Sequence, residues 1–236
     1  MSHQLNLEIV DADGAIRESA EAAGLDRAGF LKKGALAGGG LIAGSAMFGT
    51  FLSSAEAAIS TTKRSKANDV KILNYALTLE FLEADFYDKV INSGLVKDRA
   101  TVDIAKKFGA TEQEHVDALK ATIKKLGGKP VNAPKTKFEP TLDKGLKAVL
   151  ETAATVENLG AAAYLGQAGN IKSKEVLAAA LAIHSVEARH AAALNILVGR
   201  GFGDGKGGLE GALPDGAFGK PMDEAAVLAA VKPFLA

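Results

Sequence analysis

Glutamates within the apolar stripes of four helix-like segments constrain this chain more than any other feature of its sequence. Between residues 68 and 199, apolar residues recur every three or four positions, which is the period of an α-helix. An unpaired carboxylate in an apolar core costs several kcal/mol, and neighbouring carboxylates also repel one another. The chain must therefore fold so that something neutralises these side chains. The polar residues on the four stripes are Glu80, Glu112 with His115, Glu157, and Glu187 with His190.

The connections between the segments predict how the helices are arranged. Short turns join the first helix to the second and the third to the fourth, so we expect two antiparallel hairpins. The connection at 127–141 can extend to about 50 Å, whereas a helix of about 26 residues is about 39 Å long. We therefore predict an all-α four-helix bundle with a long crossover between helices two and three. The expected helices begin at Asn68, as a cap, and span roughly 68–91, 99–126, 142–169, with Leu146 on its stripe, and 173–198, with Leu197 on its stripe.

The chain divides into three parts by composition. Residues 1–57 form a signal-like N-terminal segment, residues 58–199 the four-helix bundle, and residues 200–236 a C-terminal loop with a short helix near 223–232. No alternating strand pattern competes with the helices between residues 68 and 199.

The N-terminal part has the layout of a secretory signal. Lys32 and Lys33 precede an apolar, glycine-rich run over 34–52, and a small-residue cleavage motif follows at 55–57. The stretch "RAGFLKK" resembles the twin-arginine export motif, although Ala28 stands where the second arginine belongs. We expect export with cleavage after Ala57, and the alternative is a retained membrane anchor, because the apolar run nearly spans a bilayer.

The spacing of the polar residues suits a pair of metal ions. In Glu-x-x-His, side chains three positions apart share one helical face, so each of the two pairs can clamp one metal. Four carboxylates carry about four negative charges, which two divalent cations balance, and neutral imidazoles add ligand atoms without charge. Glu80 and Glu157 can bridge the two ions or complete one site each. These ligands suit iron or manganese, and zinc is compatible with them.

The two predicted hairpins look like copies of each other. Glu80 is followed seven residues later by Tyr87, and Glu157 likewise by Tyr164. Both second helices carry Glu-x-x-His. An approximate two-fold axis through the metal pair would relate the two halves, and a crossover of full bundle length is the connection that this symmetry requires.

The ligand pattern resembles that of the ferritin-like di-iron and di-manganese carboxylate proteins, in which two helices give one Glu each and two give Glu-x-x-His. "LNYALTLEFLEADFY" is similar to the first helix of bacterioferritin-type chains, with Glu80 at the ligand position. "VENLGAAAYLG", "HSVEARHAAAL" and the tail "PDGAFGKPMDEAAVLAAVKPFL" resemble the exported ferritin-like family that includes desiccation-related proteins. The resemblance covers about residues 68–235. The resemblance implies a ferritin-like four-helix bundle. It also implies two iron ions, with manganese as the alternative, held by Glu80, Glu112, His115, Glu157, Glu187 and His190.

Neighbours of these residues have two interpretations each. Tyr87 and Tyr164 either donate hydrogen bonds to ligand carboxylates or pack in the core. His184 either supports a ligand or is a partly buried polar residue, which we favour. Glu83 is either an extra ligand or, as we favour, a solvated or helix-interface residue. Two further acidic residues, Glu114 and Asp117, are expected to face solvent.

Composition excludes several functions. The formal net charge of zero argues against nucleic-acid binding through bulk charge. The absence of cysteine removes disulfides, thiolate metal sites and cysteine nucleophiles.

We expect a buried metal centre, without other catalytic residues, that oxidises Fe(II) or reacts with O2 or peroxide in stress protection, with manganese-catalase-like activity as a variant. A non-catalytic, metal-binding or structural desiccation-related protein is the alternative, and iron storage in a homo-oligomeric cage is a third. A membrane is a partner only if the N-terminal segment is retained.

Overall fold

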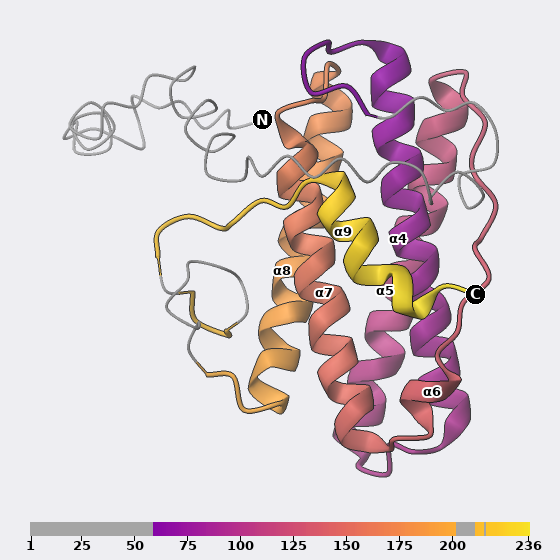
Figure 1. Ribbon diagram of the computed structural model, residues 1–236, viewed down its shortest axis with the longest axis vertical. Coiled ribbons are helices and arrows are strands. Elements are labelled where there is room, and N and C mark those ends of the chain that lie inside the picture. The colour runs from indigo at the N-terminus through magenta and orange to yellow at the C-terminus, as the bar shows by residue number, and fades with distance from the viewer. Residues whose placement is uncertain (1–58, 202–210, 215) are drawn as a thin grey trace, which may run out of the picture. The chain divides into compact units, whose positions relative to one another are not determined.

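The structure is a computed structural model, and it describes residues 59–201, 211–214 and 216–236. The predicted signal-like segment at 1–57 lies outside these residues. Four long antiparallel helices pack side by side, as expected, and a short C-terminal helix lies across one face of the bundle (Figure 1). The helices are α4 (Lys66–Ser93), α5 (Arg99–Lys125), α6 (Glu139–Leu142), α7 (Leu146–Ala168), α8 (Lys174–Leu197) and α9 (Glu224–Val231), followed by the 3-10 turn η1 (Lys232–Phe234). Among the described residues, none of the helices has the length and hydropathy that a membrane span requires.

The first helix begins earlier than the sequence predicted. Ser65 is its N-cap, and the Ser65 side chain accepts a hydrogen bond from the backbone N–H of Asn68 at 3.0 Å. The predicted capping role of Asn68 is therefore wrong. Asn68 is instead buried, and its amide donates to the carbonyl oxygens of Ser60 at 3.0 Å and Asn170 at 3.3 Å. It joins the start of α4 to the turn that follows α7.

Buried polar side chains on α4 fasten the connections at this end of the bundle. Asp69 accepts hydrogen bonds from the backbone N–H groups of Lys172 at 2.7 Å and Ser173 at 2.9 Å. Asn74 donates to the carbonyl of Lys129 at 3.1 Å and accepts from the N–H of Val131 at 2.9 Å. Both the turn between α7 and α8 and the start of the crossover are thus held by α4.

Apolar side chains at the other end of the bundle are less buried. Leu146 and Leu197, which the sequence placed on the apolar stripes, are 40% and 39% exposed. They lie at the first residue of α7 and the last residue of α8, where no further helical turn covers them. The predicted burial of these two leucines is therefore wrong.

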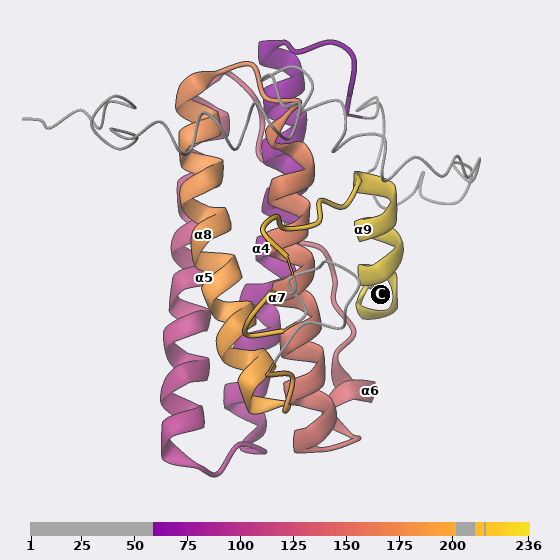
Figure 2. The same ribbon diagram turned by 90° about the vertical axis from the view of Figure 1, so that its left-hand side faces the viewer.

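The C-terminal segment packs against α4 and α7, on the side opposite α5 and α8 (Figure 2). The N–H of Met222 donates to the carbonyl of Ala162 at 3.1 Å. A Cβ added to Gly166 would lie 1.8 Å from the Met222 carbonyl oxygen, so only glycine allows this close crossing of α7. Val227 and Val231 of α9 then enter the core, with 0% and 2% exposure.

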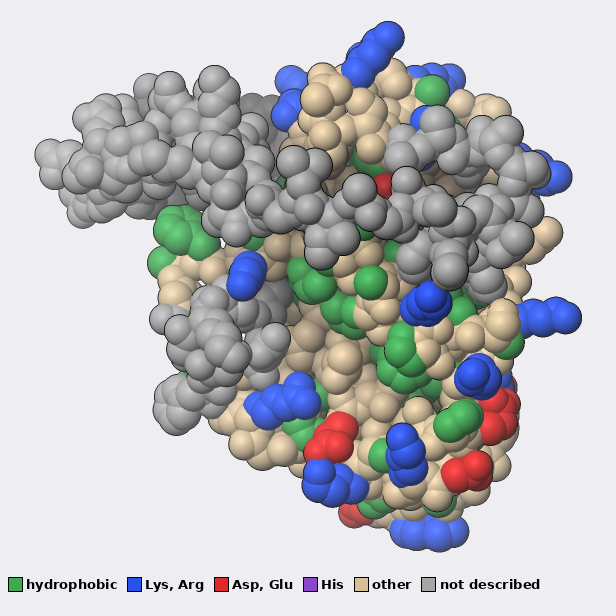
Figure 3. Space-filling model, viewed as in Figure 1, with side chains coloured by type: hydrophobic (Ala, Val, Ile, Leu, Met, Phe, Trp, Pro, Cys, Tyr) green, Lys and Arg blue, Asp and Glu red, His purple; other side chains and the backbone are tan. Residues whose placement is uncertain are grey.

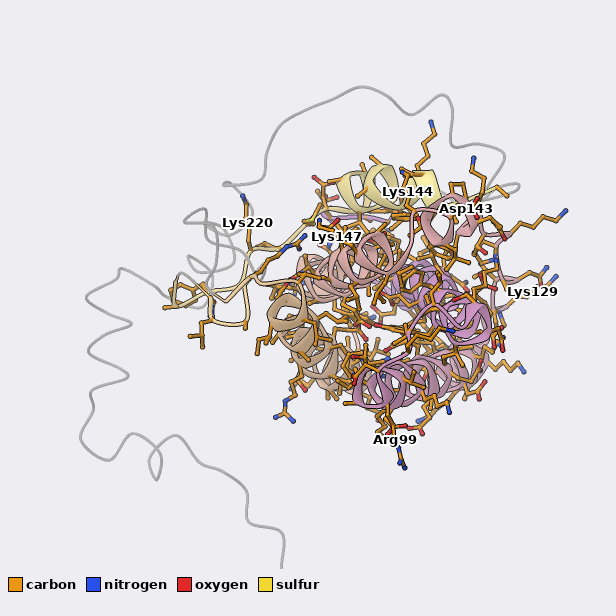
Figure 4. All side chains as sticks on the ribbon, turned by 90° about the horizontal axis from the view of Figure 1, so that it is seen from below. Arg99, Lys129, Asp143, Lys144, Lys147 and Lys220 are labelled. Carbon is orange, nitrogen blue, oxygen red and sulfur yellow. The ribbon has the colours of Figure 1, made fainter. Side chains whose placement is uncertain are left out.

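Charged side chains are scattered over the outside of the bundle. On the described part of the face in Figure 3, lysines and arginines are scattered over the surface, and acidic side chains lie among them mainly in its lower part. Figure 4 shows the labelled side chains Arg99 and Lys129 pointing away from the helices. Charges of opposite sign are thus mixed on the outer surface seen in these views.

Candidate metal centre

The middle of the bundle holds the six polar residues that the sequence singled out. Each of the four long helices carries one of the glutamates near its centre, and all four are 0% exposed. His115 on α5 and His190 on α8 follow their glutamates by three residues and are 8% and 6% exposed. Because residues three apart share a helical face, each Glu-x-x-His pair points into the bundle as a unit.

The six side chains form two overlapping groups. Glu80, Glu112, His115 and Glu187 bring their ligand atoms within 4.8 Å of one another. Glu112, Glu157, Glu187 and His190 do the same on the other side. Glu112 and Glu187 belong to both groups, whereas Glu80 and Glu157 belong to one group each. Glu80 and Glu157 thus lie on opposite sides of the cluster, each beside one of the two histidines.

The imidazoles face the carboxylates through Nδ1. His115 Nδ1 lies 2.9 Å from Glu112 Oε2, 3.1 Å from Glu80 Oε2 and 3.2 Å from Glu187 Oε1. His190 Nδ1 lies 2.8 Å from Glu112 Oε1 and 3.2 Å from Glu157 Oε2. Only the His115 contacts with Glu80 and Glu112 have hydrogen-bond geometry, and a single N–H is crowded by three oxygens. The atoms instead converge as ligands do around a common point.

Several of these buried atoms have no hydrogen-bond partner. The His190–Glu112 contact is short, but its angles do not make a hydrogen bond. Buried polar atoms in native proteins are nearly always satisfied, so each exception needs a physical reason. A bound cation would satisfy all of them, and carboxylate oxygens with imidazole nitrogens suit iron, manganese or zinc. The unpartnered ligand atoms are Glu112 Oε1, Glu157 Oε2, Glu187 Oε1 and Oε2, and His190 Nδ1.

The pKa values show how strongly the site is charged. Burial raises the pKa of Glu80 to about 7, and burial with repulsion from neighbouring carboxylates raises the pKa of Glu187 well above its usual range. Burial also opposes ionisation of Glu112, but its contacts with both histidines prevail and lower its pKa to about 2. Burial opposes protonation of the histidines too, yet the surrounding carboxylates raise the pKa of His115 to about 12 and of His190 to about 9. In the metal-free protein, protons therefore supply the positive charge that a metal would bring.

Two tyrosines donate hydrogen bonds, in a reciprocal arrangement, to Glu80 and Glu157, the carboxylates that belong to one group each. The Tyr87 hydroxyl on α4 donates to Glu157 Oε1 on α7, and the Tyr164 hydroxyl on α7 donates to Glu80 Oε1 on α4. Both tyrosines are buried. The structure thus selects hydrogen bonding over plain core packing, and the exchange between α4 and α7 has the two-fold relation that the sequence repeat predicted.

Glu83 departs from that symmetry. It is 2% exposed and lies against α7, so the helix-interface part of the role that the sequence favoured fits, and the solvated part does not. Gly160 occupies the equivalent place in the second hairpin, three residues after Glu157. A Cβ on Gly160 would lie 2.7 Å from Glu187 Oε2 and 3.0 Å from Glu83 Oε1. The missing side chain on α7 therefore makes room for a fifth buried carboxylate, from α4.

Sequence reasoning missed the role of Gly160. The available signal was a glycine in mid-helix, where it is unfavourable, at the repeat position of an acidic residue. Sequence reasoning also missed the contact of Phe108 with the cluster. Its ring stacks on His190 with centroids 3.8 Å apart and fixes the plane of that imidazole.

The remaining candidates lie outside the cluster. His184 is half-buried, as favoured, and its Nδ1 donates to the backbone carbonyl of Ala161 at 2.9 Å, not to a cluster carboxylate. Glu114 and Asp117 are exposed, as expected.

Comparisons with known proteins agree with this architecture. Residues 68–200 match the family model of the ferritin-like domain. No curated protein matches the sequence significantly. The matched region is more than half of the chain and contains all six clustered residues. The chain therefore belongs to the ferritin-like domain family.

Proposed function

We propose that the chain binds two metal ions, iron or manganese, in the central cluster, and that the reduced metals react with dioxygen or hydrogen peroxide. The observation that carries this proposal is the pair of overlapping ligand groups whose buried atoms lack hydrogen-bond partners. His115 and Glu80 would hold one ion, and His190 and Glu157 the other. Glu112 and Glu187, which belong to both groups, would contribute ligand oxygens to the same centre.

The charges support two divalent ions. Four carboxylates balance two such ions once the histidines are neutral, and the fifth, Glu83, stays protonated because burial and its carboxylate neighbours raise its pKa well above the usual range. Loading therefore releases the protons that the metal-free ligands retain. When bound, two Fe(II) ions would supply one electron each, so that one dioxygen and two protons give one hydrogen peroxide, while a manganese pair would convert two hydrogen peroxide into one dioxygen and two water.

The protein's own residues would position the ligands and keep water out. Tyr87 and Tyr164 orient the carboxylates of Glu157 and Glu80 through their hydroxyls, and Phe108 orients the ring of His190. The glutamates are fully buried, so competing water has little access to their oxygens. These contacts hold the ligand atoms in place before a metal arrives.

We propose further that the protein acts outside the cytoplasm, in the periplasm, cell envelope or medium, in protection against oxidative or drying stress. The signal-like layout of residues 1–57 supports this. N-terminal sequencing of the protein from its native host tests it. A mature chain that starts at Ala58 supports export with cleavage, and an intact N-terminus in a membrane fraction indicates the anchor.

Stopped-flow absorbance tests the reaction itself. The full chain is loaded anaerobically with Fe(II) or Mn(II) and mixed with dioxygen or hydrogen peroxide, beside the exposed control Glu114→Gln. Oxidation faster than that of free metal, retained in Glu114→Gln and lost in Glu112→Gln, supports the proposal. Metal that binds tightly but gains no reactivity indicates the non-catalytic, metal-binding stress protein instead.

A further inference from the structure

An apolar pocket lies inside the bundle beside the carboxylate cluster. Its volume is about 40 Å³, and side chains from all four long helices line it, among them Leu73, Ala76, Leu119, Tyr164, Ala180 and Ile183. The walls are almost entirely hydrocarbon. Three polar residues also line it, but their polar groups are engaged elsewhere. The Tyr164 hydroxyl donates to Glu80, the Thr122 hydroxyl donates to the carbonyl of Ala118 at 2.8 Å, and the Gln167 side-chain oxygen accepts from Asn170 at 3.0 Å.

Helix geometry places the pocket directly next to the cluster. Ala76 comes four residues before Glu80, and Ile183 comes four residues before Glu187. Leu119 likewise follows His115 by four residues. Because residues four apart are neighbours on a helix face, the pocket forms the layer one helical turn from the ligands.

The pocket approaches the surface between α5 and α8. Its lining includes Ala118 of α5 and Ala179 of α8, and both alanines are exposed. This seam lies on the side of the bundle away from α9, which packs on α4 and α7 (Figure 2). Small side chains thus mark the place where a small molecule can enter.

The chemistry of the walls decides what the pocket holds. A water molecule needs about 10–15 Å³ and two to four polar partners, so here there is space enough but too few partners. Hydrogen peroxide carries two O–H donors and loses its hydrogen bonds with water on entering such a site. Dioxygen is small and apolar, so it has no hydrogen bonds with water to lose on entering the pocket.

We propose that this pocket binds dioxygen and holds it one helical turn from the cluster. The inference rests on the proposed function and selects dioxygen over hydrogen peroxide as its oxidant. No bond forms or breaks in the pocket. The electrons come from the reduced metals, as in the balanced reaction above.

Xenon, an apolar atom, tests the pocket without any metal. Methyl NMR of the metal-free full chain under xenon pressure should shift the resonances of Ile72 and Ile183, which line the pocket, and leave that of Val149 in the other part of the core unchanged. Ala180→Leu, which fills the space, should abolish the shifts. The exposed neighbour Ala178 provides the matched control Ala178→Leu. Absence of xenon shifts in the unmodified chain overturns the proposal.

Oxidation kinetics test delivery to the cluster. In the metal-loaded chain, Ala180→Leu should slow oxidation by dioxygen about tenfold, which corresponds to about 1.4 kcal/mol of lost binding. Oxidation by peroxide and the metal content should stay unchanged. Ala118→Leu at the mouth serves as a second variant if the core variant does not fold. Unchanged dioxygen kinetics in a folded variant that has lost xenon binding overturns delivery. Failure to take up metal contradicts the proposed function, while the xenon result still decides whether the pocket takes an apolar gas.

Discussion

Replacing Glu80 with glutamine should change the stability of the protein in opposite directions with and without metal. Burial raises the pKa of Glu80 from its ordinary value of 4.5 to about 7 in the folded, metal-free chain. Each pKa unit corresponds to about 1.4 kcal/mol, so ionised Glu80 costs about 3 kcal/mol of folding free energy above pH 7. Glutamine carries no charge and still offers an oxygen to the Tyr164 hydroxyl.

The sign follows from the direction of the pKa change. A carboxyl group whose pKa is raised by folding favours the folded state below its unfolded pKa, and this contribution is lost as the pH rises through about 7. Glu80→Gln should therefore stabilise the metal-free chain by up to about 3 kcal/mol at pH 8 and have little effect at pH 4. With metal at 100 times its dissociation constant, the unmodified chain should gain about 2.7 kcal/mol, and the variant should gain less.

Urea unfolding, followed by circular dichroism at both pH values with and without Mn(II), measures these changes. Glu114→Gln is the matched control, because Glu114 is exposed and lies outside the cluster. A variant that is less stable than the unmodified chain at pH 8 without metal, or that keeps the full stabilisation by metal, would refute the reasoning.

Three further predictions concern the same site. Gly160→Ala should weaken metal binding and cost about 1–3 kcal/mol of stability, because its Cβ would meet two carboxylates; calorimetry should show no such loss for Gly169→Ala, where the space is open. Tyr87→Phe and Tyr164→Phe should each lower metal affinity about 10- to 100-fold by removing one support of a ligand carboxylate; unequal losses in metal titrations would contradict their equivalence. Metal affinity should rise between pH 5 and 8, since Glu80, with its pKa raised to about 7, must lose its proton to bind; a flat titration profile would contradict this.

Helix periodicity was sufficient to predict most of the bundle and to choose the residues of the cluster. Each long helix agrees with the expectation within four residues at its ends, and all six candidates meet at the centre. The reason is geometric. A residue on the apolar stripe of a helix faces the bundle interior whatever its own polarity, so a glutamate on that stripe must be buried.

The departures arise where contacts distant in sequence decide the outcome. Asn68 has the right chemistry for a cap, but its buried bond to Asn170, 102 residues away, assigns it another role. Periodicity could not choose between a solvated and a helix-interface position for Glu83, because its burial depends on the absence of a side chain at Gly160 on another helix. Such contacts between helices do not change the hydrophobic periodicity of a single segment, so that periodicity cannot predict them.

Metal stoichiometry of the purified full chain tests the central claim most directly. The chain, loaded anaerobically with Fe(II) or Mn(II) and freed of excess metal, is measured by elemental analysis beside the double variant Glu112→Gln/Glu187→Gln, which alters the two carboxylates common to both groups. The account predicts about two ions per chain, lost in a variant that remains folded. A well-folded, unmodified chain that takes up no metal would contradict it.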